Sequence, residues 1–230
     1  MPSNPTSLDN GIITEEHLAH KDAVSSTLAA EALGAKSRKP KATPVSGDAL
    51  LEKIAAELYG ISSMLLGEGE EAVGLIEGVV ANVDLPTCCD TAEAHRKARL
   101  LLAADAITVL GRSSTNNAAL AAPGDESGPE GCIEDDDLSA AGVTPEVLEQ
   151  MITGPDRHRL RDWLEGLSDS LRVIFVLRAI AALTSVEVAR LLSEHGGSAA
   201  KGWTPEAVRG SFRQALCSLT SQLIHASATR

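Results

Sequence analysis

Aromatic side chains are almost absent from this chain. Phe, Trp and Tyr make up only 2% of its 230 residues, namely Tyr59, Trp163, Phe175, Trp203 and Phe212. An all-β sandwich with so few aromatics would be unusual, because aromatic and β-branched side chains fill pleated surfaces. Ala and Leu dominate the apolar residues, and both favour helices. The composition therefore predicts an all-α protein.

Cysteine is scarce as well, and no two cysteines form a CxxC pair. The four are Cys88, Cys89, Cys132 and Cys217. We therefore expect no disulfide framework and a cytoplasmic location. The start of the chain lacks a basic region followed by an apolar core, so no signal peptide is predicted. The most apolar stretch, residues 171–183, is interrupted by Arg172 and Arg178, so we expect no membrane span.

Patterns that carry catalysis or cofactor binding are missing too. The sequence has no Ser/His/Asp grouping, no P-loop and no Gly-rich dinucleotide turn, so neither an enzyme nor a cofactor is predicted. Cys88 and Cys89 with His95 are a candidate metal site, but adjacent cysteines rarely chelate one ion well. Asp135–Asp137 lacks the spaced ligands of a calcium loop, which favours a solvated acidic loop. We expect no bound metal.

Charge is unevenly distributed along the chain, whose formal net charge is -12. Residues 113–155 contain nine acidic and no basic side chains, whereas residues 156–230 carry a net charge of +3. Only the last segment has a charge suited to phosphate. This asymmetry suggests that the acidic segment folds over the basic one and competes with nucleic acid for it.

Helical spacing and breakers divide the chain into five parts. Residues 1–47 are predicted to be a flexible arm, 48–112 a bundle of three helices, 113–155 an acidic linker with one short helix, 156–224 a second bundle, and 225–230 a tail. The predicted fold is thus two small helical bundles joined by an acidic linker.

The second bundle has the pattern of a helix-turn-helix. Thr184 and Glu187 form a capping box, and Thr204 followed by Pro205 opens another helix. That last helix has an apolar stripe beginning at Val208, with polar and cationic residues predicted to face outward: Glu206, Arg209, Ser211, Arg213 and Gln214. A helix that enters the major groove needs such a face. The alternative is an ordinary surface helix whose arginines are merely solvated.

Three linked motifs in this bundle resemble region 4 of extracytoplasmic-function sigma factors, the bacterial promoter-recognition subunits. They are Trp163–Arg178, Leu183–Ala189 and Ala207–Leu219. Leu65–Ala81 resembles part of region 2 of the same family more weakly. The resemblance implies that the second bundle is a helix-turn-helix of the winged-helix-like region 4 type, without strands. It also implies a transcription initiation protein whose partners are the RNA polymerase core and promoter duplex DNA, with an anti-sigma protein as a further candidate.

The resemblance assigns residues to each partner. Contacts to DNA are expected from Lys201, Thr204, Glu206, Arg209, Ser211, Arg213 and Gln214. Contacts to the polymerase are expected from Leu75, Ile76, Glu77, Val79 and Val80.

The sequence also departs from the family pattern. Gly74 and Gly78 replace polar residues in the region 2 helix, and no aromatic residue lies between 85 and 110 to capture unstacked bases. Residues 193–203 are inserted between the two helices of the helix-turn-helix, and we expect Trp203 at their end to be partly buried. Two alternatives therefore stay open: a sigma-like interaction protein that has lost promoter melting, and a helical enzyme with an unrecognised site.

Overall fold

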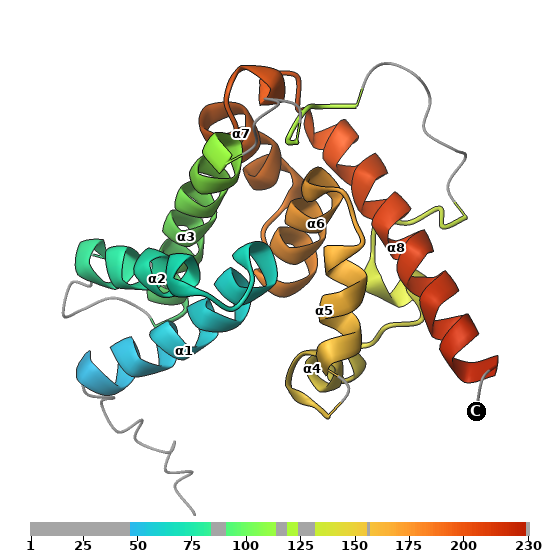
Figure 1. Cartoon of the computed structure of the whole chain (residues 1–230), viewed down its shortest axis with the longest axis horizontal. Coiled ribbons are helices and arrows are strands. Elements are labelled where there is room, and N and C mark those ends of the chain that lie inside the picture. The colour runs from blue at the N-terminus through green and yellow to red at the C-terminus, as the bar shows by residue number, and fades with distance from the viewer. Residues whose placement is uncertain (1–46, 84–90, 114–118, 124–131, 156, 229–230) are drawn as a thin grey trace, which may run out of the picture. The chain divides into compact units, whose positions relative to one another are not determined.

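The described part of the protein, taken from a computed structural model, consists of helices and connecting segments. It covers residues 47–83, 91–113, 119–123, 132–155 and 157–228 (Figure 1). No strand occurs among these residues, so the predicted all-α class is confirmed. The arm expected over residues 1–47 lies outside the described residues, apart from Gly47. None of the described helices is both long and apolar enough to cross a membrane.

The first three helices follow the predicted periodicity. They are α1 (Gly47–Leu66), α2 (Glu70–Asn82) and α3 (Thr91–Ser113), and each packs against the other two. Their shared core consists of fully buried aliphatic side chains, among them Ile54, Leu58, Ile61, Leu65, Leu102 and Ile107. α1 ends at Gly67, whose φ of 85° favours glycine and whose N–H donates to the Ser63 carbonyl at 3.0 Å.

The acidic linker contains one short helix where the sequence predicts it. α4 (Pro145–Thr153) is capped by Thr144, whose hydroxyl accepts the N–H of Val147, and it follows the 3₁₀ turn η1 (Leu138–Ala141). Val143 is fully buried and Leu148 nearly so. These apolar residues hold the second half of the linker on the core.

The apolar stretch at residues 171–183 lies in the middle of the core. It begins within α6 (Asp169–Phe175), which passes into the π-helical turn η2 (Val176–Ile180). Residues 173–177 are all fully buried. The Arg178 Nη1 group donates to the Leu183 carbonyl at 3.1 Å and so closes the segment that follows the turn. α5 (Arg157–Glu165) precedes it.

The last two helices begin at the predicted caps. The Thr184–Glu187 capping box opens α7 (Ser185–His195). Burial raises the pKa of Glu187, but hydrogen bonds from Thr184 and the charge of Arg96 outweigh it, so the pKa lies below its ordinary value. α8 (Pro205–Ala228) continues past residue 224, the predicted end of the second bundle, into the segment predicted to be a tail.

The connection between α7 and α8 includes the 3₁₀ turn η3 (Ser198–Ala200) and ends at Trp203. Trp203 is only 5% exposed, and its Nε1 donates to the Leu120 carbonyl at 2.8 Å. The predicted burial of Trp203 is therefore confirmed. Its polar partner lies in residues 119–123, a segment far away in sequence.

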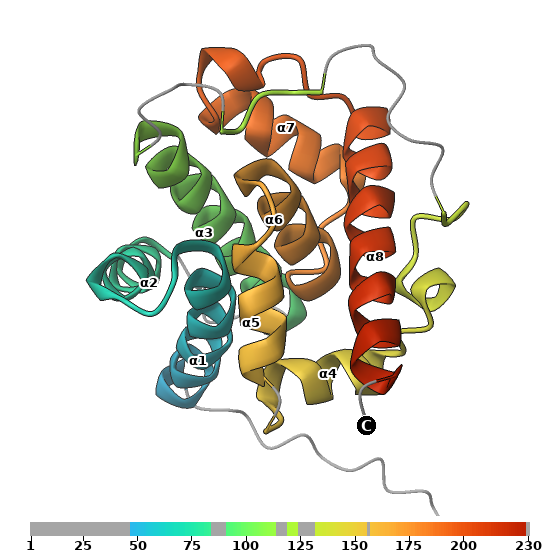
Figure 2. The ribbon, with the colours of Figure 1, turned by 45° about the vertical axis from the view of Figure 1, so that its right-hand side comes forward.

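Helices from both expected bundles contact one another. α3 packs against α7, as Figure 2 shows, and Arg96 of α3 forms an ion pair with Glu187 of α7. Arg161 of α5 pairs with Glu68 at 2.6 Å. Residues 45–230 form one compact unit, so the expected separation into two bundles is not confirmed.

Candidate nucleic-acid interface on helix α8

Helix α8 starts from a side-chain cap. The Thr204 hydroxyl accepts the N–H of Ala207 at 3.1 Å, so a backbone donor of the first turn is satisfied. Pro205 occupies the first helical position, where its missing N–H costs nothing. The cap fixes the point at which α8 leaves the inserted connection, and with it the direction of every later side chain.

One face of α8 is locked into the core. Its buried residues are Val208, Ser211, Phe212, Ala215, Leu216 and Leu219. The Phe212 ring lies 6.0 Å from the ring of Phe175 on α6, centroid to centroid, and the Arg178 guanidinium lies 5.1 Å from the Phe212 centroid. This stripe holds the helix in one rotation about its axis.

The structure places most of the predicted DNA contacts at the surface. Lys201, Thr204, Glu206 and Gln214 are exposed, and Arg209 and Arg213 are half-buried. Arg209 forms an ion pair with Glu206, one turn earlier. The hydrogen bond and charge of Glu206 raise the pKa of Arg209 above its ordinary value, and the charge of Asp136 adds to this effect.

Ser211 is the exception. It is 8% exposed and belongs to the buried face, so the prediction that it points outward is wrong. On a helix, Ser211 lies about 60° from Val208 in projection, on the apolar side. A residue so placed cannot contact a base edge while α8 keeps its packing.

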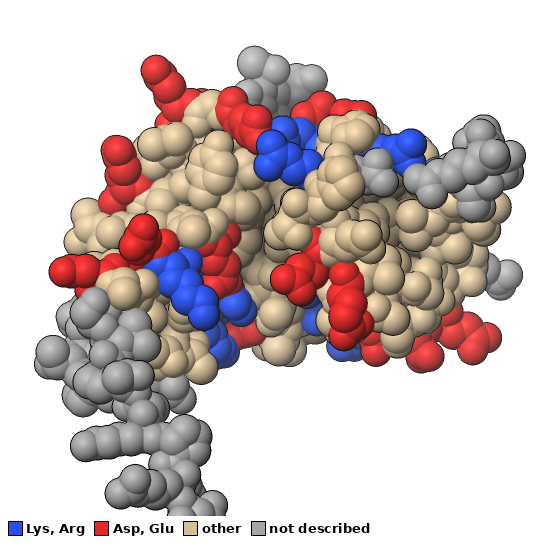
Figure 3. Space-filling view, turned by 90° about the horizontal axis from the view of Figure 1, so that it is seen from below, with Lys and Arg blue, Asp and Glu red and all other residues tan. Residues whose placement is uncertain are grey.

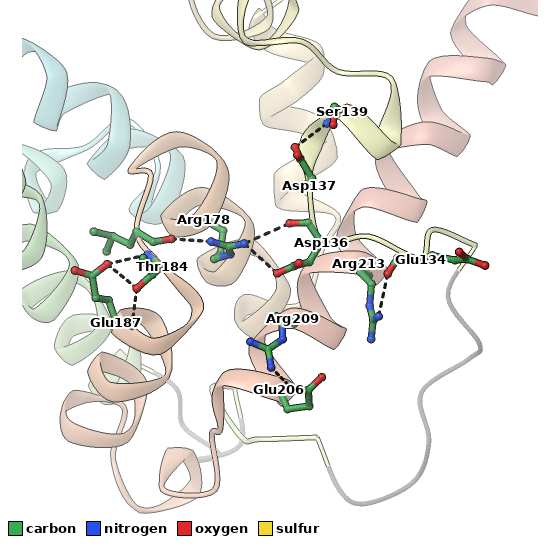
Figure 4. A network of polar contacts seen from close by, with 11 residues as sticks. Glu134, Asp136, Asp137, Ser139, Arg178, Thr184, Glu187, Glu206, Arg209 and Arg213 are labelled. Carbon is green, nitrogen blue, oxygen red and sulfur yellow. Dashed lines mark hydrogen bonds and ion pairs between the residues drawn. The ribbon is translucent and has the colours of Figure 1, made fainter.

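The acidic linker lies across the exposed flank of α8 (Figure 4). The Arg213 Nη1 group donates to the backbone carbonyl of Glu134 at 3.1 Å. The Arg178 Nη2 group donates to the backbone carbonyl of Asp136 at 3.3 Å and to its Oδ2 atom at 3.1 Å. Sequence reasoning did not foresee the role of Arg178; the signal was a charged residue within an apolar helix.

A disulfide joins the same linker to α8. Cys132 and Cys217 are bonded, although 85 residues separate them in sequence. The expectation that the cysteines form no disulfide is therefore wrong for this pair. Spacing rules look for clustered cysteines, whereas this bond depends on the linker folding back over α8. Cys88 and Cys89, the candidate metal ligands, lie outside the described residues. Among the described residues, no group of three or more His, Cys, Asp or Glu side chains is placed to hold a metal ion.

Charges of both signs are interspersed over the surface seen in Figure 3. Lys and Arg side chains there stand beside Asp and Glu side chains and form no continuous basic field on that face. A protein that binds DNA chiefly through phosphate usually presents such a field. A DNA contact on this face would therefore depend on a few separate cations rather than on a continuous basic field.

The predicted polymerase contacts on α2 are divided between core and surface. Leu75 and Val79 are buried in the helical core, so they are not available to a partner. Glu77 is exposed, and Ile76 and Val80 are half-buried. The outward face also carries Val73, which is 45% exposed and lines a shallow hollow between α1 and α2.

No protein-family model, no curated protein and no solved structure matches this chain.

Proposed function

We propose that this protein acts in transcription initiation as a sigma-factor-like subunit, which binds the RNA polymerase core and promoter duplex DNA. The observation that carries the proposal is the construction of α8. The helix is capped at Thr204, and its buried stripe packs against α6 and α7. Arg209, Arg213 and Gln214 lie outside this stripe and are at least partly exposed. A reading helix needs this division between a packed face and a polar, cationic face.

The proposed activity is binding rather than catalysis. Arg209 lies in the second turn of α8, and arginine can donate two hydrogen bonds to guanine in the major groove. Its present partner is the exposed carboxylate of Glu206. Exposed pairs of this kind contribute about 0–1 kcal/mol, so DNA could displace Glu206 at little cost.

Docking on the polymerase would use the outward face of α2. Of the residues expected there, Glu77 is exposed and Ile76 and Val80 are partly accessible. Val73 adds an apolar side chain to the same helix surface. A mixed apolar and acidic face of this kind suits a partner helix with basic flanks.

The second candidate function is a sigma-like interaction protein that binds polymerase or another regulator without melting a promoter. Two observations favour it. Ser211 is buried and Arg213 is engaged by the linker, which leaves α8 with few groups for base readout. No aromatic residue occurs between Tyr59 and Trp163, so α2 and α3 carry no ring on which a flipped base could stack.

Run-off transcription with core polymerase, paired with a pull-down on immobilised polymerase, tests the proposal. Arg209→Ala should weaken promoter binding by about 1–3 kcal/mol if the side chain contacts a base. Arg190→Ala is the matched control, because it removes the same charge from an exposed position on α7. The two variants should differ in promoter binding and agree in polymerase retention.

The outcomes separate the candidates. Specific transcripts that Arg209→Ala reduces and Arg190→Ala does not would support the sigma-like function. Retention on polymerase without any transcript would favour the interaction protein. A chain that neither binds polymerase nor supports transcription would reject the sigma-like function and, for the interaction protein, the polymerase as its partner.

A further inference from the structure

Residues 132–137, here called the acidic strap, are attached at both ends. At one end Cys132 is bonded to Cys217 in the middle of α8. At the other end the chain enters η1, where the Asp137 side chain accepts the N–H of Ser139 at 3.0 Å, and then reaches the fully buried Val143. The strap therefore has a covalent attachment beside the buried Ile133 at one end and an apolar attachment at the other.

Between these ends the strap contacts two arginines. The Glu134 carbonyl accepts a hydrogen bond from Arg213 of α8, and Asp136 accepts from Arg178 through its backbone and its carboxylate (Figure 4). Arg178 in turn lies over the ring of Phe212. The strap thus forms a hydrogen bond with Arg213 of α8. It also brings the Asp136 carboxylate close enough to Arg209 of α8 for their charges to interact.

The remaining charge of the strap points to solvent. The carboxylate residues Glu134, Asp135 and Asp137 are exposed, and the strap contains no basic residue. These carboxylates belong to the segment that contacts Arg213, so they add negative charge to the surroundings of that arginine. Like charges at close range oppose association, and the opposition weakens as salt screens them.

We propose that the Cys132–Cys217 pair is a redox site: its disulfide holds the acidic strap over α8, and reduction by a dithiol frees Arg213. Reduction removes the covalent attachment of the strap. The buried side chains of Ile133 and Val143 and the hydrogen bonds to Arg213 and Arg178 then hold the strap alone. These contacts are non-covalent and reversible, so the reduced strap opens more often than the disulfide-bonded strap.

The exchange balances with an external dithiol. Cys132 is exposed whereas Cys217 is half-buried, so a thiolate of the dithiol attacks the Cys132 sulfur. The bond between the two protein sulfurs breaks, and Cys217 leaves as a thiolate that takes up a proton. The second thiol of the reductant then displaces Cys132 and closes a cyclic disulfide. The chain gains two electrons and two protons, and the dithiol loses them.

Labelling of arginine measures the strap directly. The full-length chain, oxidised or treated with dithiothreitol, is exposed to an arginine-specific dicarbonyl and digested for mass spectrometry. Reduction should raise the labelling of Arg213 several-fold relative to Arg190, which is exposed on α7 and serves as the internal reference. Far-ultraviolet circular dichroism confirms that the helices persist. Cys132→Ser should show the high labelling of Arg213 with or without the dithiol.

Binding to duplex DNA at low salt measures the consequence, which rests on the function proposed above. Reduced chain should bind about tenfold more tightly than oxidised chain, because a repulsive field in front of α8 is removed. The difference should shrink as salt rises and vanish in Cys132→Ser. Asp135→Asn, which removes one exposed charge but keeps the disulfide, should narrow the difference without abolishing it.

Arginine labelling tests the redox site, and DNA binding tests the masking of DNA, so each claim can be contradicted without the other. Unchanged Arg213 labelling after complete reduction would overturn the redox site, whatever the DNA result. Increased labelling with equal DNA affinity in both states would overturn the masking of DNA. Increased labelling in a chain that binds no DNA in either state would support the redox site and contradict the proposed DNA-binding function.

Discussion

Trp203 offers a sharp test of the packing because its hydrogen bond is buried at both ends. The Nε1 group donates to the Leu120 carbonyl at 2.8 Å, and these residues are 5% and 2% exposed. Trp203→Phe keeps a ring in place but leaves that carbonyl without its donor, which costs about 1–3 kcal/mol. The smaller ring also leaves a cavity, which adds to the loss. We therefore expect the free energy of unfolding to fall by about 2–4 kcal/mol.

Trp163 supplies the matched control. It is 7% exposed, and its Nε1 donates to the Ser218 hydroxyl at 3.1 Å. A hydroxyl can rotate toward another partner, so Trp163→Phe should lose only the net value of the bond, about 1 kcal/mol, together with a similar cavity cost. Urea titrations followed by circular dichroism measure the free energy of unfolding of both variants, and their m-values are compared as a check. Equal losses for the two variants would refute the claim that the Leu120 carbonyl depends on Trp203.

Replacing Cys132 and Cys217 together by Ser should lower the free energy of unfolding by about 4 kcal/mol in the chain-entropy view, because the bond spans 85 residues; urea titrations check this value. Glu187→Gln should make stability less dependent on acid. Because the pKa of Glu187 is lowered, its charge stabilises the fold at pH values above the ordinary pKa of 4.5. This contribution is lost as the pH falls through the pKa of the folded state. Thermal melts at several pH values detect the loss. Gly74→Ala should raise the free energy of unfolding by up to about 1 kcal/mol, because an added Cβ meets no atom within 4 Å in a helix. Gly67→Ala should lower it by about 1 kcal/mol, because its φ of 85° strains any other residue; the same melts separate the two glycines.

Helix positions could be predicted because their signals are local. Thr184 and Thr204 were both expected to open helices, and each accepts a backbone N–H in the structure. A cap acts within one turn, so the sequence around it contains the whole interaction. The π-helical end of α6 was not predicted, because it depends on how Arg178 and the buried core meet that turn.

The candidate site was predicted less well, because three residues assigned to partners are buried. Leu75 and Val79 were assigned by resemblance to a motif, and Ser211 was also expected to face outward from the pattern of its helix. On α2 the buried residues Ala72, Leu75 and Val79 recur at intervals of three and four, which is the pattern of a core stripe. On α2, helical periodicity was therefore a better guide to exposure than the position of a residue in the motif.

The contact between the acidic linker and α8 lay beyond local reasoning, yet charge foreshadowed it. A segment with nine acids and no base precedes a segment of net charge +3, and the structure brings Glu134 and Asp136 to arginines of the second segment. Charge could indicate attraction but could not identify the two cysteines that meet. In a reducing compartment a disulfide of this kind is expected to be transient. Because the chain stays anchored at η1 after reduction, Cys132 remains within a short tether of Cys217, and such a tether favours rejoining over pairing with a second molecule. The anchor at η1 therefore allows the Cys132–Cys217 bond to form again after it has been reduced.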